Sequence, residues 1–332
     1  MPQIKVTQDT VQFQEKLDSP WNPLTKGTIR TIVKGNRIQK TDDSGRIAVD
    51  CGGGFQVFNN LSTVNEPFAL SDLCSAPVPQ SSENNEIPFI YIPRKTSLLS
   101  NQPIIRWNKV TDATTYTIEL IDKDANKIWT QDVDSSDVCQ GGICKIDYSG
   151  TPLETNQIHN LIITTDTGRS TEESVVPNTG FQVIVAARAL EINQKINDIK
   201  NLGLSNTEQG LKISEIYEQN NLIAEAILIL ENLSDVDKTS DVYCQLGEFY
   251  YYYLDLPIKG AELLQTAINK ATDIKQAAVA QIELAELKII FGKKDEAKAL
   301  LEESLNKYTT LGAVEHQDHI DYINQKLKQL LP

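Results

Sequence analysis

The pattern of apolar and polar residues changes character near residue 180. Before that point, short runs such as "GTIRTIVKG" and "TYTIELID" alternate apolar with polar residues and are separated by Gly, Asn and Asp, which predicts strands joined by turns. After it, apolar residues recur every three or four positions, as in "GLKISEIYEQNNLIAEAILILENL", which predicts amphipathic helices. Eleven of the thirteen prolines precede the change, and proline interrupts helices. The sequence therefore predicts an all-β region followed by an all-α region.

A polar stretch, "PVPQSSENNEIPFI", divides the β region in two. We expect a small β domain at residues 1–76, a linker at 77–90, a second β domain at 91–185 and a helical domain at 186–332. The second β domain contains six or seven predicted strands, with turn signals at the spacing expected of a β-sandwich.

The helical domain contains three similar stretches. In each predicted first helix, an apolar residue precedes a small one, and in each second helix a small residue precedes a leucine by four positions. The small residues are Ser214, Gly247 and Ala285 in the first helices, and Ala226, Gly260 and Ala297 in the second. Small residues let paired helices approach closely, and larger ones fill the space between pairs.

This spacing resembles the tetratricopeptide repeat, a helical hairpin of about 34 residues. The resemblance implies an α-solenoid, with an entry helix at 186–202 and a closing helix at 315–331. The middle repeat is longer by about one residue between Gly247 and Gly260, and its sequence there includes "FYYYYLDLP". Pro257 fits the start of the second helix, where no backbone N–H is needed.

The resemblance also implies that the first helices line a concave face. Tyr243, Leu246 and Tyr250 form a stripe expected to face the core, whereas a glutamate follows each small residue and apolar side chains accompany it. The predicted partner-binding residues are Leu211, Glu215, Glu218, Glu248, Tyr251, Tyr252, Ile282, Glu286, Ile289 and Ile290. Such a face would suit a protein partner with a basic, partly apolar segment. The alternative is that these glutamates are simply exposed helix formers.

The β domains carry weaker resemblances. The stretch "PIIRWNKVTDATTYTIELID" resembles a fibronectin type III or related immunoglobulin-like domain, which implies a core tryptophan at Trp107 and inward-facing Tyr116, Ile118 and Leu120. The stretch "GNRIQKTDDSGRIAVDC" resembles FecR-type β domains, where it would form paired strands. The order of the three regions resembles multidomain envelope proteins of cyanobacteria.

Four of the five cysteines lie in the β region. Cys139 and Cys144 bound the loop "CQGGIC", and Cys51 and Cys74 flank a small β unit, so two disulfides are expected and an oxidising compartment is favoured. Free thiols and a metal site remain alternatives. Cys244 is interpreted as a small buried apolar residue.

Charge and termini restrict the partners and the location. The net charge of −14 is spread along the chain, which disfavours general binding to nucleic acid or anionic membranes. No apolar run is long enough to span a membrane, and the N-terminus lacks a signal peptide. We expect a periplasmic or cell-envelope location with the leader absent from this chain, or else a cytoplasmic one.

No catalytic motif is found, and neither a cofactor nor a metal is expected. His316 and His319 are three residues apart, a spacing that could hold a metal ion, but no further ligands are evident. The sequence therefore predicts a non-enzymatic protein-binding scaffold. The alternative is a structural or carbohydrate-contacting envelope component that acts through its β domains.

Overall fold

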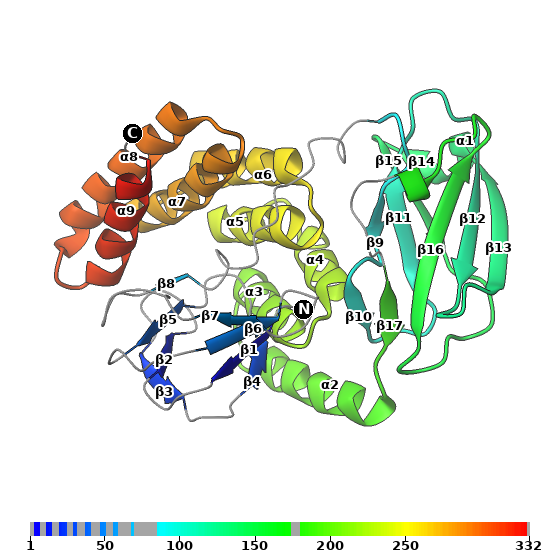
Figure 1. The fold of residues 1–332 in the computed structure, drawn as a ribbon, viewed down its shortest axis with the longest axis horizontal. Coiled ribbons are helices and arrows are strands. Elements are labelled where there is room, and N and C mark those ends of the chain that lie inside the picture. The colour runs from blue at the N-terminus through cyan, green and yellow to red at the C-terminus, as the bar shows by residue number, and fades with distance from the viewer. Residues whose placement is uncertain are drawn as a thin grey trace. The chain divides into compact units, whose positions relative to one another are not determined.

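The computed structural model shows β-sheets in the N-terminal part of the chain and helices in the C-terminal part (Figure 1). It describes residues 85–173 and 180–330, and in the first 84 residues it describes 3–6, 11–14, 20–24, 29–31, 37–40, 47–50, 56–58 and 68–69. The chain forms two compact units, one of Met1–Pro77 with Leu264–Pro332 and the other of Val78–Leu263. The domain boundaries expected from the sequence stay predictions.

The strands of the Val78–Leu263 unit form two sheets. Their bounds are β9 Ile90–Ile92, β10 Thr96–Leu98, β11 Ile104–Asn108, β12 Thr115–Ile121, β13 Lys127–Asp134, β14 Cys139–Gln140, β15 Ile143–Asp147, β16 Ile158–Thr165 and β17 Phe181–Val183. One sheet has the order β10-β17-β16-β12-β13 and the other β14-β15-β11-β9. All strand pairs are antiparallel except β10 with β17. A short helix, α1 (Ser135–Val138), follows β13.

The core of these two sheets lies between them. Trp107 of β11 and Tyr116 of β12 belong to different sheets, and their rings meet edge to face with centroids 5.4 Å apart. Along β12 every second side chain is buried, so Tyr116, Ile118 and Leu120 point inward, as the alternation predicts. The hydroxyl of Tyr116 accepts a hydrogen bond from the backbone N–H of Val110 at 2.8 Å. Burial of these large side chains is the main stabilisation of the sheet pair.

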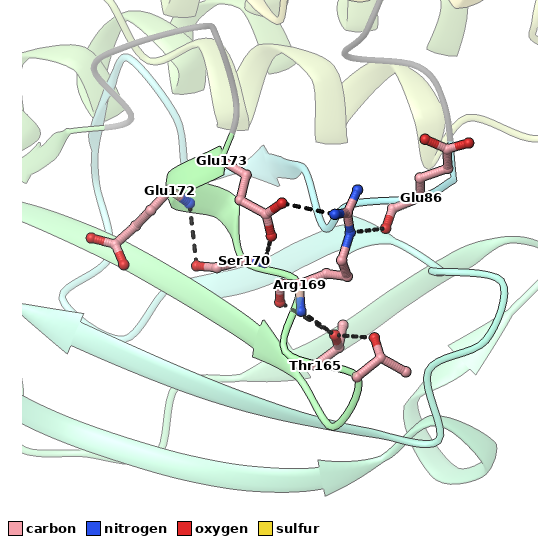
Figure 2. A network of polar contacts seen from close by, with 7 residues as sticks. Glu86, Thr165, Arg169, Ser170, Glu172 and Glu173 are labelled. Carbon is pink, nitrogen blue, oxygen red and sulfur yellow. Dashed lines mark hydrogen bonds and ion pairs between the residues drawn. The ribbon is translucent and has the colours of Figure 1, made fainter.

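A polar network closes the turn after β16 (Figure 2). Arg169 forms an ion pair with Glu173 at 3.0 Å and donates to the backbone carbonyl of Glu86 at 3.3 Å. Its backbone N–H donates to Thr165 Oγ1 at 3.0 Å, and Glu173 accepts from the backbone N–H of Ser170 at 2.7 Å, within and beside the 3₁₀ turn Thr171–Glu173. The network therefore holds the segment that enters the β-sheets against the β16 turn.

The helices of this unit begin directly after β17. They are α2 Ala186–Lys200, α3 Asn206–Gln219, α4 Ile223–Glu231, α5 Ser240–Glu248, a π-helical turn at Phe249–Tyr253, and α6 Pro257–Lys270, which continues past the unit boundary. Helix α3 begins at a capping box, in which Ser205 and Glu208 satisfy each other's backbone N–H groups. The expected entry helix corresponds to α2.

The π-helical turn accounts for the extra residue of the middle repeat. Its backbone bonds span five residues, and Leu254 N–H donates to Phe249 O at 3.2 Å. A π turn accommodates one more residue than an α turn. Gly260 of α6 packs closely behind it, because a Cβ at that position would lie 2.8 Å from the Cβ of Tyr251 and 2.9 Å from the carbonyl oxygen of Gly247.

The sheets and the first helices share one hydrophobic core, which runs from Trp107 and Tyr116 to Ile227 of α4 and Phe249. Polar contacts cross the same junction. Arg94 pairs with Asp255 at 2.8 Å, and Arg106 pairs with Glu231 at 2.5 Å. Strand β10 itself contacts the start of α4 through the hydrogen bonds of Thr96 and Ser97 with Ile223 and Asn221.

In the other unit, α7 (Ile274–Ile290) and α8 (Lys294–Gly312) form a helical hairpin followed by α9 (Gln317–Gln329). Asp273 caps α7 by accepting from the backbone N–H of Gln276. Ala285, Ala297 and Leu301 are fully buried in this hairpin. The expected closing helix corresponds to α9.

The strands of the first 77 residues form two four-stranded sheets. Their bounds are β1 Gln3–Val6, β2 Val11–Gln14, β3 Asn22–Leu24, β4 Ile29–Thr31, β5 Arg37–Lys40, β6 Ile47–Asp50, β7 Gln56–Phe58 and β8 Phe68–Ala69. The orders are β4-β1-β6-β7 and β3-β2-β5-β8. Strands β5 and β6, which come from the FecR-like stretch, belong to different sheets and pair with other strands, so the expected pairing within this stretch is wrong. Cys51 and Cys74 lie outside the described residues.

Candidate protein-binding face

Three helical hairpins have a residue with a left-handed backbone at the equivalent position of the turn between their helices. Asn221, Asp255 and Gly292 each have a left-handed backbone, with φ of 58°, 57° and 71°. Each lies five positions before the small residue of its second helix. Asn, Asp and Gly adopt this conformation more readily than other residues. The repeat spacing read from the sequence is therefore also a repeat of local backbone geometry.

The first helices of two successive hairpins lie side by side. Ser214 of α3 is fully buried, and its hydroxyl donates to the side-chain carbonyl of Gln245 of α5 at 2.9 Å. Gly247 of α5 is also buried. The small residues thus lie at the contacts between helices, as the close-packing argument expects.

Glu215 and Glu248 directly follow these buried small residues. Both are half-buried, so part of each side chain reaches the surface of the Val78–Leu263 unit. Leu211, one turn before Glu215, is half-buried as well and packs on the shared core. This unit therefore presents two carboxylates at equivalent positions of neighbouring first helices.

Glu218 occupies a different environment from Glu215. It is only 8% exposed and accepts a hydrogen bond from the hydroxyl of Tyr253 at 2.9 Å. Burial, together with the negative charge of Glu218, raises the pKa of Tyr253 well above its ordinary value. The carboxylate of Glu218 therefore forms a hydrogen bond that joins α3 to the π-helical turn.

The four consecutive tyrosines divide into two buried and two half-buried side chains. Tyr250 and Tyr253 are buried, and Tyr250 donates to Glu231 at 2.5 Å. Tyr251 and Tyr252 remain partly accessible, with ring centroids 6.4 Å apart in an edge-to-face arrangement. The π-helical turn thus places two adjacent aromatic rings at the surface without removing their neighbours from the core.

The predicted residues of α7 belong to the other unit. Ile282 is 3% exposed, so its side chain lies in the core of the hairpin. Glu286 accepts a hydrogen bond from Tyr322 and lies 3.8 Å from the ammonium of Lys326, both on α9. Ile289 is half-buried and Ile290 is 37% exposed. The acidic ladder across all three repeats stays a prediction.

The histidines take part in ring packing. His319 is buried and stacks on Tyr308 with centroids 4.3 Å apart, and His159 is buried beside Phe181 at 5.8 Å. Burial lowers the pKa of His159. Within the described part of the chain, no group of three or more His, Cys, Asp or Glu side chains could hold a metal ion.

The structure pairs Cys139 with Cys144 in a disulfide between the neighbouring strands β14 and β15. Cys244 of α5 is a buried thiol. The first pairing expected from the "CQGGIC" loop is thus present, and Cys244 lies in the packed environment that its interpretation assumes.

Sequence reasoning missed the polar junction between β10 and α4. Glu225 lies there, and close to it Arg106 of β11 pairs with Glu231 at the end of α4, while Arg94, just before β10, pairs with Asp255 of the turn before α6. Apart from Arg94, which Lys95 follows, these charges occur singly in largely apolar segments, so periodicity alone gave no signal. Their strand and helix partners are more than a hundred residues apart in the sequence.

In the described residues, none of the helices has the length and apolar character needed to cross a lipid bilayer. Neither a family model nor a curated protein matches the chain. Among solved structures, two crystal structures of MamA are similar. The first is 20% identical, covers 43% of this chain and 89% of MamA, and has a TM-score of 0.28. The second is 22% identical, covers 44% and 79%, and has a TM-score of 0.27.

A cryo-EM structure of the E. coli alpha-2-macroglobulin is 10% identical to this chain. It covers 92% of this chain and 24% of that protein, with a TM-score of 0.20. TM-scores this low do not establish a shared fold for any of the three structures.

Proposed function

We propose that the chain is a non-enzymatic protein-binding scaffold of the tetratricopeptide type, and that its first helices hold a basic, partly apolar segment of another protein. The observation that carries the proposal is the equivalence of α3 and α5. Glu215 and Glu248 follow buried small residues on two helices that Ser214 and Gln245 hold side by side. A binding face built on packed helices has fixed geometry, which favours specific recognition.

The chemistry of this face favours a cation. Carboxylates at Glu215 and Glu248 would attract Lys or Arg, and the partly accessible rings of Tyr251 and Tyr252 would contact apolar side chains or the face of a guanidinium. Glu286, Ile289 and Ile290 of α7 belong to the other unit, so their part in the face stays a prediction from the sequence. Within the Val78–Leu263 unit, Glu218 would contribute mainly by supporting the face, because it is buried.

The remaining proposals concern the β regions and the location. The two packed sheets of residues 90–183 are consistent with an immunoglobulin-like sandwich. The FecR-like assignment of the first 77 residues rests on the sequence resemblance of residues 35–51 alone. The Cys139–Cys144 disulfide favours an oxidising compartment such as the periplasm or cell envelope. In this proposal the β regions position the helical hairpins, and no step of catalysis is assigned to any residue.

Peptide titration tests the proposed face. A labelled, helix-forming peptide of Lys and Leu should bind the full chain more tightly than a peptide with Glu in place of Lys. Reversing both carboxylates, Glu215→Lys with Glu248→Lys, should weaken binding of the basic peptide by roughly tenfold to a hundredfold, because two favourable charge contacts become repulsive. Fluorescence anisotropy at constant salt measures the affinity.

The matched control is the pair Asp235→Lys with Glu262→Lys. Both side chains are well exposed in the same unit, with 101% and 63% side-chain exposure, and the total charge changes equally. If the control pair weakens binding as much as the test pair, attraction by net charge explains the result and the proposed face is wrong. Equal affinity for the basic and acidic peptides would also contradict it.

A further inference from the structure

The junction between β10 and α4, as far as the structure describes it, contains a carboxylate with a hydrogen-bond partner for only one of its two oxygens. Glu225, in the first turn of α4, accepts a hydrogen bond from the backbone N–H of Leu99 through Oε1 at 2.7 Å. Its other oxygen, Oε2, is shielded from solvent and has no hydrogen-bond partner among the described residues. A buried polar atom without a partner is costly, and more so when it carries charge.

Neutral hydrogen bonds hold the strand and the helix together around Glu225. Ser97 N–H donates to the carbonyl of Asn221 at 2.7 Å, and Thr96 Oγ1 accepts from the backbone N–H of Ile223 at 2.9 Å. These bonds pair backbone amide and carbonyl groups at the start of α4 that lack a partner within the helix. Glu225 adds an ionisable group to these neutral contacts, since its Oε1 accepts from the backbone N–H of Leu99.

The charged groups nearby do not neutralise Glu225. From α3, Tyr217 faces it, and burial together with Glu225 raises the pKa of Tyr217. At the start of β10, Lys95 pairs with Asp255 at 2.7 Å. On β11 and at the end of α4, Arg106 and Glu231 pair with each other.

We infer that Glu225 makes the contact between the β-sheets and the helical hairpins of this unit responsive to pH. The β10–α4 junction is closed when the carboxyl is protonated and opens more readily when it is ionised. Protonation removes the charge from a carboxyl whose Oε2 is shielded, and it leaves Oε1 able to accept from Leu99. Ionisation places an unpaired negative oxygen in the junction, and opening the β10–α4 contact lets water reach it.

The direction of the pH effect follows from the burial. Burial raises the pKa of Glu225 from its ordinary 4.5 to about 7. The closed junction therefore binds the proton more tightly than the open one. The stabilisation of the closed junction by the protonated carboxyl is complete below pH 4.5. It is lost progressively as the pH rises and is gone above about pH 7.

Hydrogen exchange of the full chain tests this inference. The protection of the Leu99 amide, corrected for the intrinsic pH dependence of exchange, should fall by roughly 80-fold between pH 4.5 and pH 7, because the carboxyl is half titrated in the open state at the first pH and in the closed state at the second. The amide of Ile118, inside β12, serves as the internal reference. Equal protection of Leu99 at the two pH values would overturn the inference.

The variant Glu225→Gln should abolish this pH dependence, because its side chain stays neutral, and should protect Leu99 at pH 8 as well as the native chain does at pH 4.5. The matched control is Glu191→Gln, an exposed glutamate on α2. The control should keep the native profile. Should Glu225→Gln fail to fold, the profile of the native chain decides, and a profile shared by the native chain and a folded Glu225→Gln would contradict the proposed role.

Discussion

The α3–α4 and α7–α8 hairpins share one sequence spacing but are covered in different ways. In both, a small residue of the first helix is buried, Ser214 in one and Ala285 in the other, and a left-handed residue makes the turn. Helix α4 is covered by a β-strand through hydrogen bonds at its first turn, whereas α8 is covered by α9 through stacked rings of Tyr308 and His319.

This difference affects which glutamates a partner could reach. Glu286 of α7 is engaged by Tyr322 and Lys326 of α9, and Glu218 of α3 by Tyr253. Repeat spacing determines where a glutamate lies on its helix. The neighbouring element determines whether its carboxylate is used inside the fold.

The largest expected effect comes from the leucines that occupy equivalent positions in the two second helices. Leu230 and Leu301 are both fully buried, so Leu230→Ala and Leu301→Ala should each lower the free energy of unfolding by about 2–5 kcal/mol. Leu230 belongs to the core shared with the β-sheets. Leu230→Ala should therefore also increase amide exchange in β11, and Leu301→Ala should not.

Urea unfolding and hydrogen exchange measure the two leucine effects. The exposed pair Leu190→Ala and Leu202→Ala, with 71% and 61% exposure, provides the control and should change stability by less than about 0.5 kcal/mol. If Leu301→Ala increased exchange in β11 as strongly as Leu230→Ala, the contrast between the two coverings would be wrong.

A smaller effect is expected at the small residue of the middle hairpin. Gly260→Ala gives that hairpin the residue that Ala297 supplies in the third, but the added Cβ would lie 2.8 Å from the Cβ of Tyr251. We expect a loss of about 1–3 kcal/mol, since the π-helical turn leaves no room for a methyl group. Thermal unfolding checks it. A stabilised Gly260→Ala variant, the usual outcome for alanine in an unstrained helix, would show that the close approach is absent.

The smallest effect concerns the polar contact between first helices. Ser214→Ala gives α3 the residue that α7 has at Ala285, and it removes the hydrogen bond to Gln245. The expected loss is about 0.5–1.5 kcal/mol by urea unfolding. A double-mutant cycle with Gln245→Ala separates this contact from the other effects of each substitution. The coupling energy should be favourable, which means that the double variant loses less stability than the two single losses added together. Strict additivity would mean that the bond does not join the helices.

The hairpins were predictable because their determinants are local. Small residues, the turn residues Asn221 and Gly292, and the inserted residue before Gly260 can all be read from short stretches. Asp255 is harder to identify as the third turn residue from the sequence, because the longer tyrosine segment shifts the apparent position of the turn. The split between Tyr250 and Tyr251 depends on the π-helical turn, which a regular helical period does not describe.

The candidate face was only partly predictable for a related reason. Half-buried Glu215 and Glu248 lie where helical periodicity puts them, but the burial of Glu218 and Ile282 depends on Tyr253 and on packing within the α7 hairpin. The Glu225 junction depends on a strand more than a hundred residues earlier. Contacts of that separation leave no periodic trace in a single sequence.

The widened turn at Phe249–Tyr253 shows how this repeat array can tolerate a change in length. One added residue would rotate everything after it by roughly 100° if the helix stayed regular, since a helical turn holds 3.6 residues. Confining the surplus to a single loosened turn lets Asp255 and Gly260 recover the five-residue interval found in the other hairpins. The extra residue is thus accommodated where it occurs, and the second helix of the same hairpin begins at the usual distance from its turn residue.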